Sequence, residues 1–150
     1  MNDVVITKSG EETLALGREF SAKLQPMDVV FLIGELGAGK TTFTKGIAEG
    51  LGIESRVISP TFVVLRTHSF NSPTTNHQSQ DIQTLYHLDL YRLDSEKHAK
   101  EVGIDDILQD KNGVTVIEWP EVAQGLVEGK VWKIIFEHVK DDRKITFKYE

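Results

Sequence analysis

Two kinds of apolar pattern alternate along this chain. Short continuous runs of Val, Ile, Leu and Phe predict strands, and an unbroken run such as residues 29–33 suits a strand buried on both faces of a parallel sheet. Residues 57–70 are also mostly β-branched and aromatic, although Ser59-Pro60 interrupts them. The strands that we predict cover residues 4–7, 29–33, 85–93, 114–117, 131–136 and 144–149, and the last two form a hairpin around residues 140–143.

Apolar residues spaced three or four apart predict helices between these strands. The first helix begins at Ser9, and Glu12 follows three residues later, as in a capping box. Residues 42–51 predict a second helix, and residues 95–108 predict a third that Gly103 interrupts.

The alternation of strands and helices predicts an α/β fold. We expect a mostly parallel central sheet flanked by helices, with a C-terminal antiparallel hairpin. A length of 150 residues favours one domain over residues 1–150. The polar stretch 71–84 predicts a long surface loop, which is either a spacer at a hairpin tip or a functional lid.

Charge and composition narrow the classes of partner and compartment. The formal net charge is -6, so this chain gains little from attraction to a phosphate backbone and is not expected to grip nucleic acid alone. The absence of cysteine excludes disulfides and thiolate metal sites. No apolar run is long enough to span a bilayer, and no signal peptide is evident. We therefore expect a cytoplasmic protein without a membrane partner.

The segment from Gly34 to Thr41 matches the pattern G-x-x-x-x-G-K-[ST] completely, between an apolar strand and a helix. This context predicts a P-loop NTPase domain, in which a curled backbone makes an anion nest at the positive end of a helix dipole. Lys40 supplies a charge for the outer phosphates, and the Thr41 hydroxyl is a magnesium ligand. Thr42 either touches the inner phosphates or is a plain first-turn residue. The remaining loop residues that we expect to hold the nucleotide are Glu35, Leu36, Gly37, Ala38 and Gly39.

Two acidic residues near predicted strand ends are candidates for the rest of a magnesium site. Glu118 follows the apolar run 114–117, and it would either ligate magnesium, directly or through water, or position the attacking water. Asp89 alternates with His87 and Tyr91 on one face of its strand. That pattern fits either an active-site acid or a solvated sheet face on which Asp89 pairs with a neighbour.

The turn Ser59-Pro60-Thr61-Phe62 follows the second predicted helix, where nucleotide-sensing loops lie in many P-loop proteins. Thr61 would reach the outer phosphate or the magnesium ion, or the segment is an ordinary turn. No Asn-Lys-x-Asp segment for reading guanine follows the P-loop, and the five histidines show no metal-ligand spacing.

The motifs in combination resemble the TsaE (YjeE) family of bacterial ATPases. The segments that carry the resemblance are ETLALG, GELGAGKTTF, SPTF, YHLDLYRL, VGIDDIL and VIEWPE, in this order and over nearly the whole chain. The stretch 71–84 is longer than is usual in the family. The resemblance implies a magnesium-dependent ATPase required for threonylcarbamoyladenosine modification of tRNA. It also implies action on a transferase pair, TsaD and TsaB, through which tRNA is contacted indirectly.

The resemblance also assigns roles to single residues. Lys40 corresponds to the phosphate lysine, Thr41 to the magnesium ligand and Thr61 to the switch threonine. Asp89 and Glu118 correspond to the active-site acids, with Glu118 the nearer to a magnesium ligand.

Five further residues are assigned more loosely. Trp119 either shapes the site or a partner face, or packs in the core. The adenine is expected near Ser9 and Gly10 and near Asp142 and Arg143.

The expected activity is slow hydrolysis of ATP alone and faster hydrolysis in the complex, because no arginine finger is obvious within the chain. Arg92 is one candidate, and an arginine from a partner is the other. Two rival functions remain: a small-molecule or nucleotide kinase, and a nucleotide sensor that does not hydrolyse.

Overall fold

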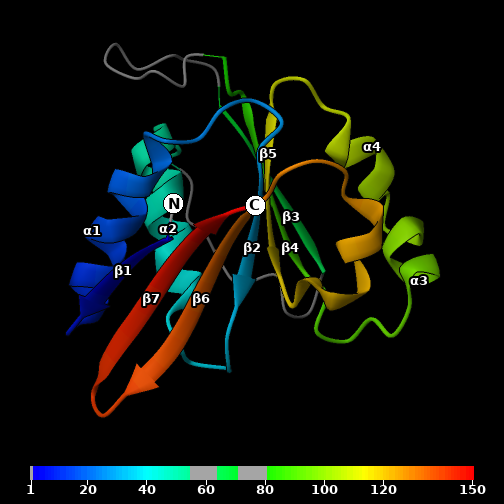
Figure 1. Cartoon of the computed structure of the whole chain (residues 1–150). Helices are drawn as coiled ribbons and strands as arrows, with labels where there is room; N and C mark the ends of the chain where they lie inside the picture. Colours follow the sequence, from blue (N-terminus) through cyan, green and yellow to red (C-terminus); the bar gives the residue numbers. More distant parts are fainter. Residues whose placement is uncertain (1, 55–63, 71–80) are drawn as a thin grey trace.

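The computed structural model describes residues 2–54, 64–70 and 81–150 (Figure 1). The strands are β1 (Asn2–Thr7), β2 (Val29–Ile33), β3 (Leu65–Ser69), β4 (Thr84–Asp89), β5 (Gly113–Glu118), β6 (Trp132–Val139) and β7 (Asp142–Tyr149). The helices are α1 (Gly10–Ser21), α2 (Lys40–Leu51), α3 (Glu96–Glu101) and α4 (Ile104–Leu108), with 3₁₀ turns at Pro120–Val122 and Gln124–Leu126. The predicted α/β character is confirmed.

Within the described residues seven strands form one sheet, in the order β1-β7-β6-β2-β5-β4-β3. Three neighbouring pairs are parallel (β2–β5, β2–β6 and β4–β5) and three are antiparallel (β1–β7, β6–β7 and β3–β4). The sheet is therefore mixed, and our prediction of a mostly parallel sheet is wrong. Both edges cause the difference, since β1 lies against the C-terminal hairpin and β3 runs back along β4.

The C-terminal hairpin is confirmed, and its strands are longer than predicted. Val139 pairs with Asp142, so the turn consists of Lys140 and Asp141 alone. Lys140 has a φ of 57°, the left-handed conformation that tight hairpin turns require.

Capping residues set the start of α1. The Ser9 side chain accepts a hydrogen bond from the Glu12 backbone N–H at 3.1 Å. In return, the Glu12 carboxylate accepts from the backbone N–H of Lys8 at 2.7 Å, one residue before the capping residue. The predicted helix start is confirmed, and the reciprocal bond reaches one residue further back than a capping box predicts.

Other predicted boundaries shift by a few residues. The second helix begins at Lys40, two residues before the predicted start. The predicted break at Gly103 is confirmed, because Gly103 has a φ of 89° between α3 and α4. The strand predicted over residues 85–93 ends at Asp89, where the Leu93 backbone N–H donates to the Leu90 carbonyl and turns the chain.

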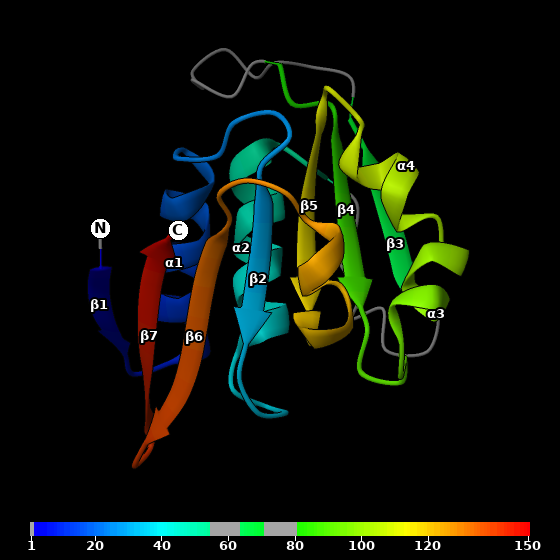
Figure 2. The ribbon, with the colours of Figure 1, turned by 45° about the vertical axis from the view of Figure 1, so that its right-hand side comes forward.

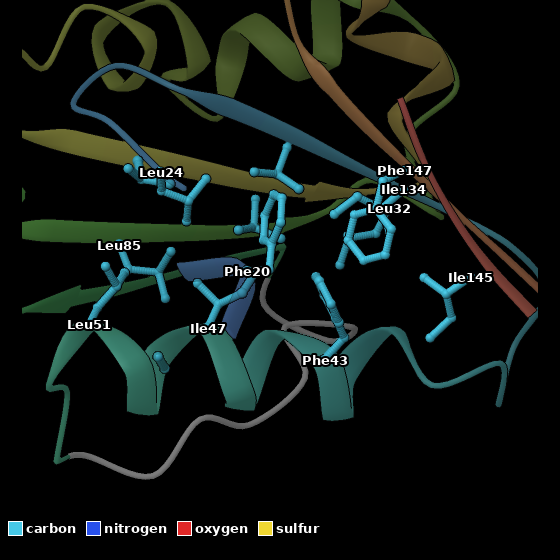
Figure 3. Close-up of a cluster of buried hydrophobic side chains, with 14 of the residues drawn as sticks. Phe20, Leu24, Leu32, Phe43, Ile47, Leu51, Leu85, Ile134, Ile145 and Phe147 are labelled. Carbon is cyan, nitrogen blue, oxygen red and sulfur yellow. The ribbon is translucent and has the colours of Figure 1, made fainter. Parts of the chain in front are cut away.

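Each face of the sheet carries its own apolar core, and the helices divide between the two faces (Figures 1 and 2). The larger core lies between the sheet and α1 and α2. Figure 3 shows it, with Phe43 and Ile47 reaching up from α2 toward Leu32 and Ile134 of the sheet. The smaller core lies under α3, α4 and the 3₁₀ turns, around Ile104 and Ile117. Helices on both faces confirm the predicted flanking.

Two predicted segments lie wholly or partly outside the described residues. The turn at residues 59–62 is one, and most of the predicted loop 71–84 is the other. The strands that flank this loop pair antiparallel, with Ser69 opposite Thr84. No helix in the described part of the chain is long and apolar enough to cross a membrane.

Candidate functional site

The glycine-rich loop, residues 34–39, connects β2 to α2. Its curled backbone includes positions that a residue with a side chain could not occupy without strain. A Cβ on Gly34 would lie 2.6 Å from the Phe136 carbonyl oxygen of β6, so only glycine fits against that strand. Gly39 has a φ of 103°, which favours glycine, and it directly precedes the first residue of α2. The loop therefore has the close approach and the backbone turn that an anion nest requires.

The first turn of α2 adds donors to this loop. Gly39 offers no side-chain cap, although the Phe43 backbone N–H bonds back to the Gly39 carbonyl at 2.9 Å. The first amide groups of a helix have no partner within the helix, and they lie at the positive end of its dipole. The N-terminus of a helix with free amide groups can bind an anion such as a phosphate.

Lys40 lies buried beneath the loop, with only 4% of its surface exposed. Its Nζ donates to the Gly34 carbonyl at 2.6 Å and lies 4.1 Å from the centre of the Trp119 ring. Burial lowers the pKa of the Lys40 ammonium from its ordinary value, and the carboxylates of Glu118 and Asp89 act against that shift. A cation is thus held at the loop between an aromatic face and two acids.

Those two acids lie side by side at the ends of neighbouring parallel strands. Asp89 of β4 is directly opposite Glu118 of β5, and both side chains are buried. The Tyr91 backbone N–H donates to Asp89 Oδ1 at 3.0 Å, and Glu118 Oε2 lies 2.7 Å from His87 Nε2. In Figure 2 the carboxyl ends of β2, β4 and β5 point the same way, so loop and acids meet at one edge of the sheet.

The interpretation of this stretch of β4 as a solvated sheet face is wrong. His87 is fully buried and Asp89 is 5% exposed. Tyr91, which we assigned to the same face, lies beyond the end of the strand and is 52% exposed. Polar groups so deeply buried need partners, so the His-Asp pattern reflects an internal polar cluster.

Trp119 turns its ring into the site. Its backbone has the uncommon left-handed conformation, with φ 55° and ψ 61°, directly after β5. The ring packs on Tyr91 at 4.9 Å between centroids and beneath the Lys40 ammonium. Of our two interpretations, the structure favours a residue that shapes the site, because Trp119 belongs to neither apolar core.

A cleft of about 200 Å³ joins these groups. It is lined by Gly10, Thr13, Leu36, Gly37, Gly39, Lys40, Thr41, Thr42, Asp89, Glu118, Trp119 and Arg143. Arg143 reaches the loop from β7, where a guanidinium N–H donates to the Gly37 carbonyl at 3.2 Å. Segments separated by more than a hundred residues therefore form one continuous surface.

The donors in this cleft fit a magnesium ion. Magnesium is commonly held by one or two carboxylates together with water and substrate phosphates, rather than by a complete protein cage. Thr41, Asp89 and Glu118 line the same cleft and supply a hydroxyl and two carboxylates. Among the described residues there is no cluster of three or more His, Asp or Glu side chains that could hold a metal ion by itself.

Comparisons with known proteins identify the family of this chain. The family model described as "Threonylcarbamoyl adenosine biosynthesis protein TsaE" matches residues 7–145. This chain belongs to the TsaE family. The TsaE protein of Bacillus subtilis is 37% identical over 142 residues, which are 94% of this chain and 82% of the relative. The TsaE protein of Treponema pallidum is 36% identical over 142 residues, covering 94% of this chain and 96% of the relative.

A solved structure extends the likeness to three dimensions. The crystal structure of Bacillus subtilis YdiB matches with a TM-score of 0.75 and 33% sequence identity. The match covers 98% of this chain and 84% of that chain. The two chains therefore share their overall fold.

Not every residue that we predicted for the site lines the cleft of this TsaE-family chain. Ser9 acts as the helix cap, and Asp142 takes part in the hairpin pairing. Glu35 is exposed on the loop, and Ala38 is a buried residue of the same loop. Thr61 lies outside the described residues.

The cleft also contains a residue that sequence reasoning missed. Thr13 lies one turn into α1, where it is 1% exposed and its hydroxyl is 2.8 Å from that of Thr7. A Cβ on Gly39 would lie 3.5 Å from the Thr13 methyl group, so the threonine directly backs the loop. The signal that could have found it is its spacing of three residues from Gly10, near which we expected the adenine.

Proposed function

We propose that this chain binds ATP with magnesium in the cleft and hydrolyses it as a P-loop ATPase. One observation carries the proposal: a buried lysine, a helix N-terminus and two buried carboxylates converge on a glycine-rich loop, at the carboxyl edge of a sheet in a TsaE-family chain. Relatives of this family are named tRNA threonylcarbamoyladenosine biosynthesis proteins. We infer that the ATPase serves this tRNA modification, and that it acts on the TsaD–TsaB transferase pair.

In this proposal the side chains act mainly through charge and position. The attacking water forms a bond to the γ-phosphorus and passes a proton to an oxygen of the phosphate that is released. The bond from the γ-phosphorus to the β–γ bridging oxygen breaks, and negative charge develops on the β-phosphate of the departing ADP. Lys40 offsets that charge from beneath the loop, and the first amides of α2 bind the phosphate oxygens. Magnesium, when bound, would neutralise further charge on the outer phosphates.

The two acids divide the remaining tasks. Glu118 and Asp89 lie opposite each other, so one would help to hold the metal while the other orients the water. Thr61 is proposed to sense the outer phosphate. Trp119 excludes water from one side of Lys40, where the ring already covers the ammonium.

The test is the release of phosphate from ATP and from GTP, by the protein alone and with TsaD–TsaB added. We expect release that requires ATP and magnesium, that rises when the partners are present, and that is lost in Lys40→Ala. Lys45→Ala is the matched control, because Lys45 is an exposed lysine of the same helix. Phosphate transfer to an added acceptor without free phosphate would indicate a kinase instead. Binding of ATP with no release under any condition would indicate a sensor.

A further inference from the structure

His87 is a fully buried histidine that is hydrogen-bonded to Glu118, a residue of the proposed site. It lies on β4, two residues before Asp89, and none of its surface is exposed. Its Nε2 lies 2.7 Å from Glu118 Oε2, which is the one hydrogen bond recorded for the Glu118 side chain among the described residues. His87 does not line the cleft itself. The hydrogen bond to Glu118 is therefore the contact through which His87 reaches the cleft.

The second ring nitrogen indicates how this pair is arranged. His87 Nδ1 is buried and has no hydrogen-bond partner in the described part of the chain. Burying an N–H group without an acceptor is costly, whereas burying an unprotonated ring nitrogen is less so. The arrangement fits the tautomer in which Nε2 carries the proton and donates a hydrogen bond to Glu118, while Nδ1 carries the lone pair.

This donor fixes one carboxylate oxygen and leaves the other outside the hydrogen bond. A lysine or arginine in its place would form an ion pair with Glu118 and compete with a metal ion for the carboxylate. A neutral imidazole N–H orients the group while leaving its negative charge available. Donors that orient the ligands of a metal in this way commonly change its affinity by about 10–100-fold when they are removed.

The neighbouring acid, Asp89, accepts a hydrogen bond from the backbone instead. Asp89 accepts from the backbone N–H of Tyr91, a donor that substitution of side chains does not remove. Glu118 depends on a side chain instead, and that side chain comes from the neighbouring strand. The orientation of Glu118 is therefore open to a direct mutational test.

We propose that His87 is the positioning residue of Glu118, and that its Nε2–H holds the carboxylate in the orientation that binds magnesium together with ATP. This inference rests on the proposed function. His87 is not a catalytic residue, since it does not line the nucleotide cleft itself.

The experiment measures binding rather than turnover. The dissociation constant of a non-hydrolysable ATP analogue is determined by calorimetry with excess magnesium and again with a chelator. The ratio compared among variants is the dissociation constant in chelator divided by that in magnesium. His87→Leu should lower this ratio by about 10-fold or more while leaving the affinity in chelator unchanged. His87→Gln should retain the ratio, because its amide nitrogen reaches the place of Nε2. In a Glu118→Gln background, His87→Leu should have no further effect.

Controls keep a loss of structure apart from a loss of orientation. His68→Leu removes another buried histidine of the sheet, on β3 opposite Leu85, and should leave the ratio unchanged. If His87→Leu does not fold, His87→Asn replaces it, since its shorter amide ends near the place of Nδ1 and cannot reach Glu118.

Three results would overturn the inference while the proposed function stands: an unchanged ratio in His87→Leu, equal losses in the leucine and glutamine variants, or an undiminished effect of His87→Leu in the Glu118→Gln background. A wild-type protein that does not bind the analogue would overturn the proposed function itself. A wild-type ratio of one would overturn its magnesium assignment. The inference would fall in either case.

Discussion

Replacing Gly46 by alanine should push α1 away from α2 and destabilise the protein. The two helices meet backbone to backbone, because Gly17 of α1 faces Gly46 of α2. A Cβ on Gly46 would collide with the Leu14 carbonyl oxygen and would lie 2.9 Å from the Gly17 Cα. These are backbone atoms, so no change of side-chain rotamer relieves the contact.

The magnitude follows from two opposing effects. Alanine is favoured over glycine inside a helix by about 1 kcal/mol. Inserting a methyl group into a tightly packed contact costs about 1–3 kcal/mol, and contacts with backbone atoms belong at the upper end of that range. The net loss should be about 1–2 kcal/mol. For a chain of this size each kcal/mol lowers Tm by about 2–4 °C.

The assay is thermal and urea unfolding followed by circular dichroism. Gly10→Ala is the control, because a Cβ at Gly10 meets no heavy atom within 4 Å and should leave the stability unchanged or slightly raised. Nucleotide affinity should also fall in Gly46→Ala, since α1 carries Thr13 and α2 carries Lys40 into the same cleft. A Gly46→Ala protein that is more stable than wild type would refute this account of the helix pair.

Three further predictions follow from single contacts. The Tyr86 hydroxyl donates to Asp110 at 2.7 Å, and burial, followed by this bond, raises the pKa of Tyr86 from 10.0 to about 12. Because the raised pKa favours the protonated phenol in the folded state, the stabilisation that Tyr86 contributes is complete below pH 10 and disappears as the pH rises through about 12. Ultraviolet titration of the tyrosines, and the pH dependence of unfolding compared between wild type and Tyr86→Phe, will check this. Arg143→Ala removes the bond to the Gly37 carbonyl and should weaken ATP binding by roughly 2–10-fold, measured by calorimetry, whereas Lys144→Ala should not. Gly34→Ala forces a methyl group against the Phe136 carbonyl and should lower both Tm and ATP affinity, and normal values of both would contradict the proposed close approach.

Local signals explain what could be predicted from the sequence. The unbroken run of β2 and the glycine-rich loop after it are encoded within a dozen consecutive residues, so their placement needed no tertiary information. The break at Gly103 and the C-terminal hairpin likewise depend on nearby residues.

Long-range pairing explains what could not be predicted. β1 pairs with β7, so Val4 lies opposite Thr146, and nothing in either segment indicates the other. Arg143 was expected at the site only through the family resemblance. Its contact with the loop depends on the hairpin lying beside β2, which the residues alone do not indicate. The end of β4 was misjudged because Leu90 is apolar and fully packed although it belongs to a turn.

The burial of the acidic pair was also hidden from the sequence. The alternation of His87 and Asp89 has the same pattern whether that face of β4 is exposed to solvent or buried. Only the position of α2 across that face of the sheet, with Lys40 at its start, shows that the polar groups are internal.

The most direct test of the central claim is the equilibrium binding of ATP with magnesium, measured by calorimetry on wild type, Lys40→Ala and Lys45→Ala. The account predicts that wild type and Lys45→Ala bind ATP equally. Lys40→Ala should bind roughly 10–100-fold more weakly, because a charge-assisted hydrogen bond to the phosphates is lost. Equal binding by all three proteins, or binding by none, would contradict the assignment of this cleft to the phosphates of ATP.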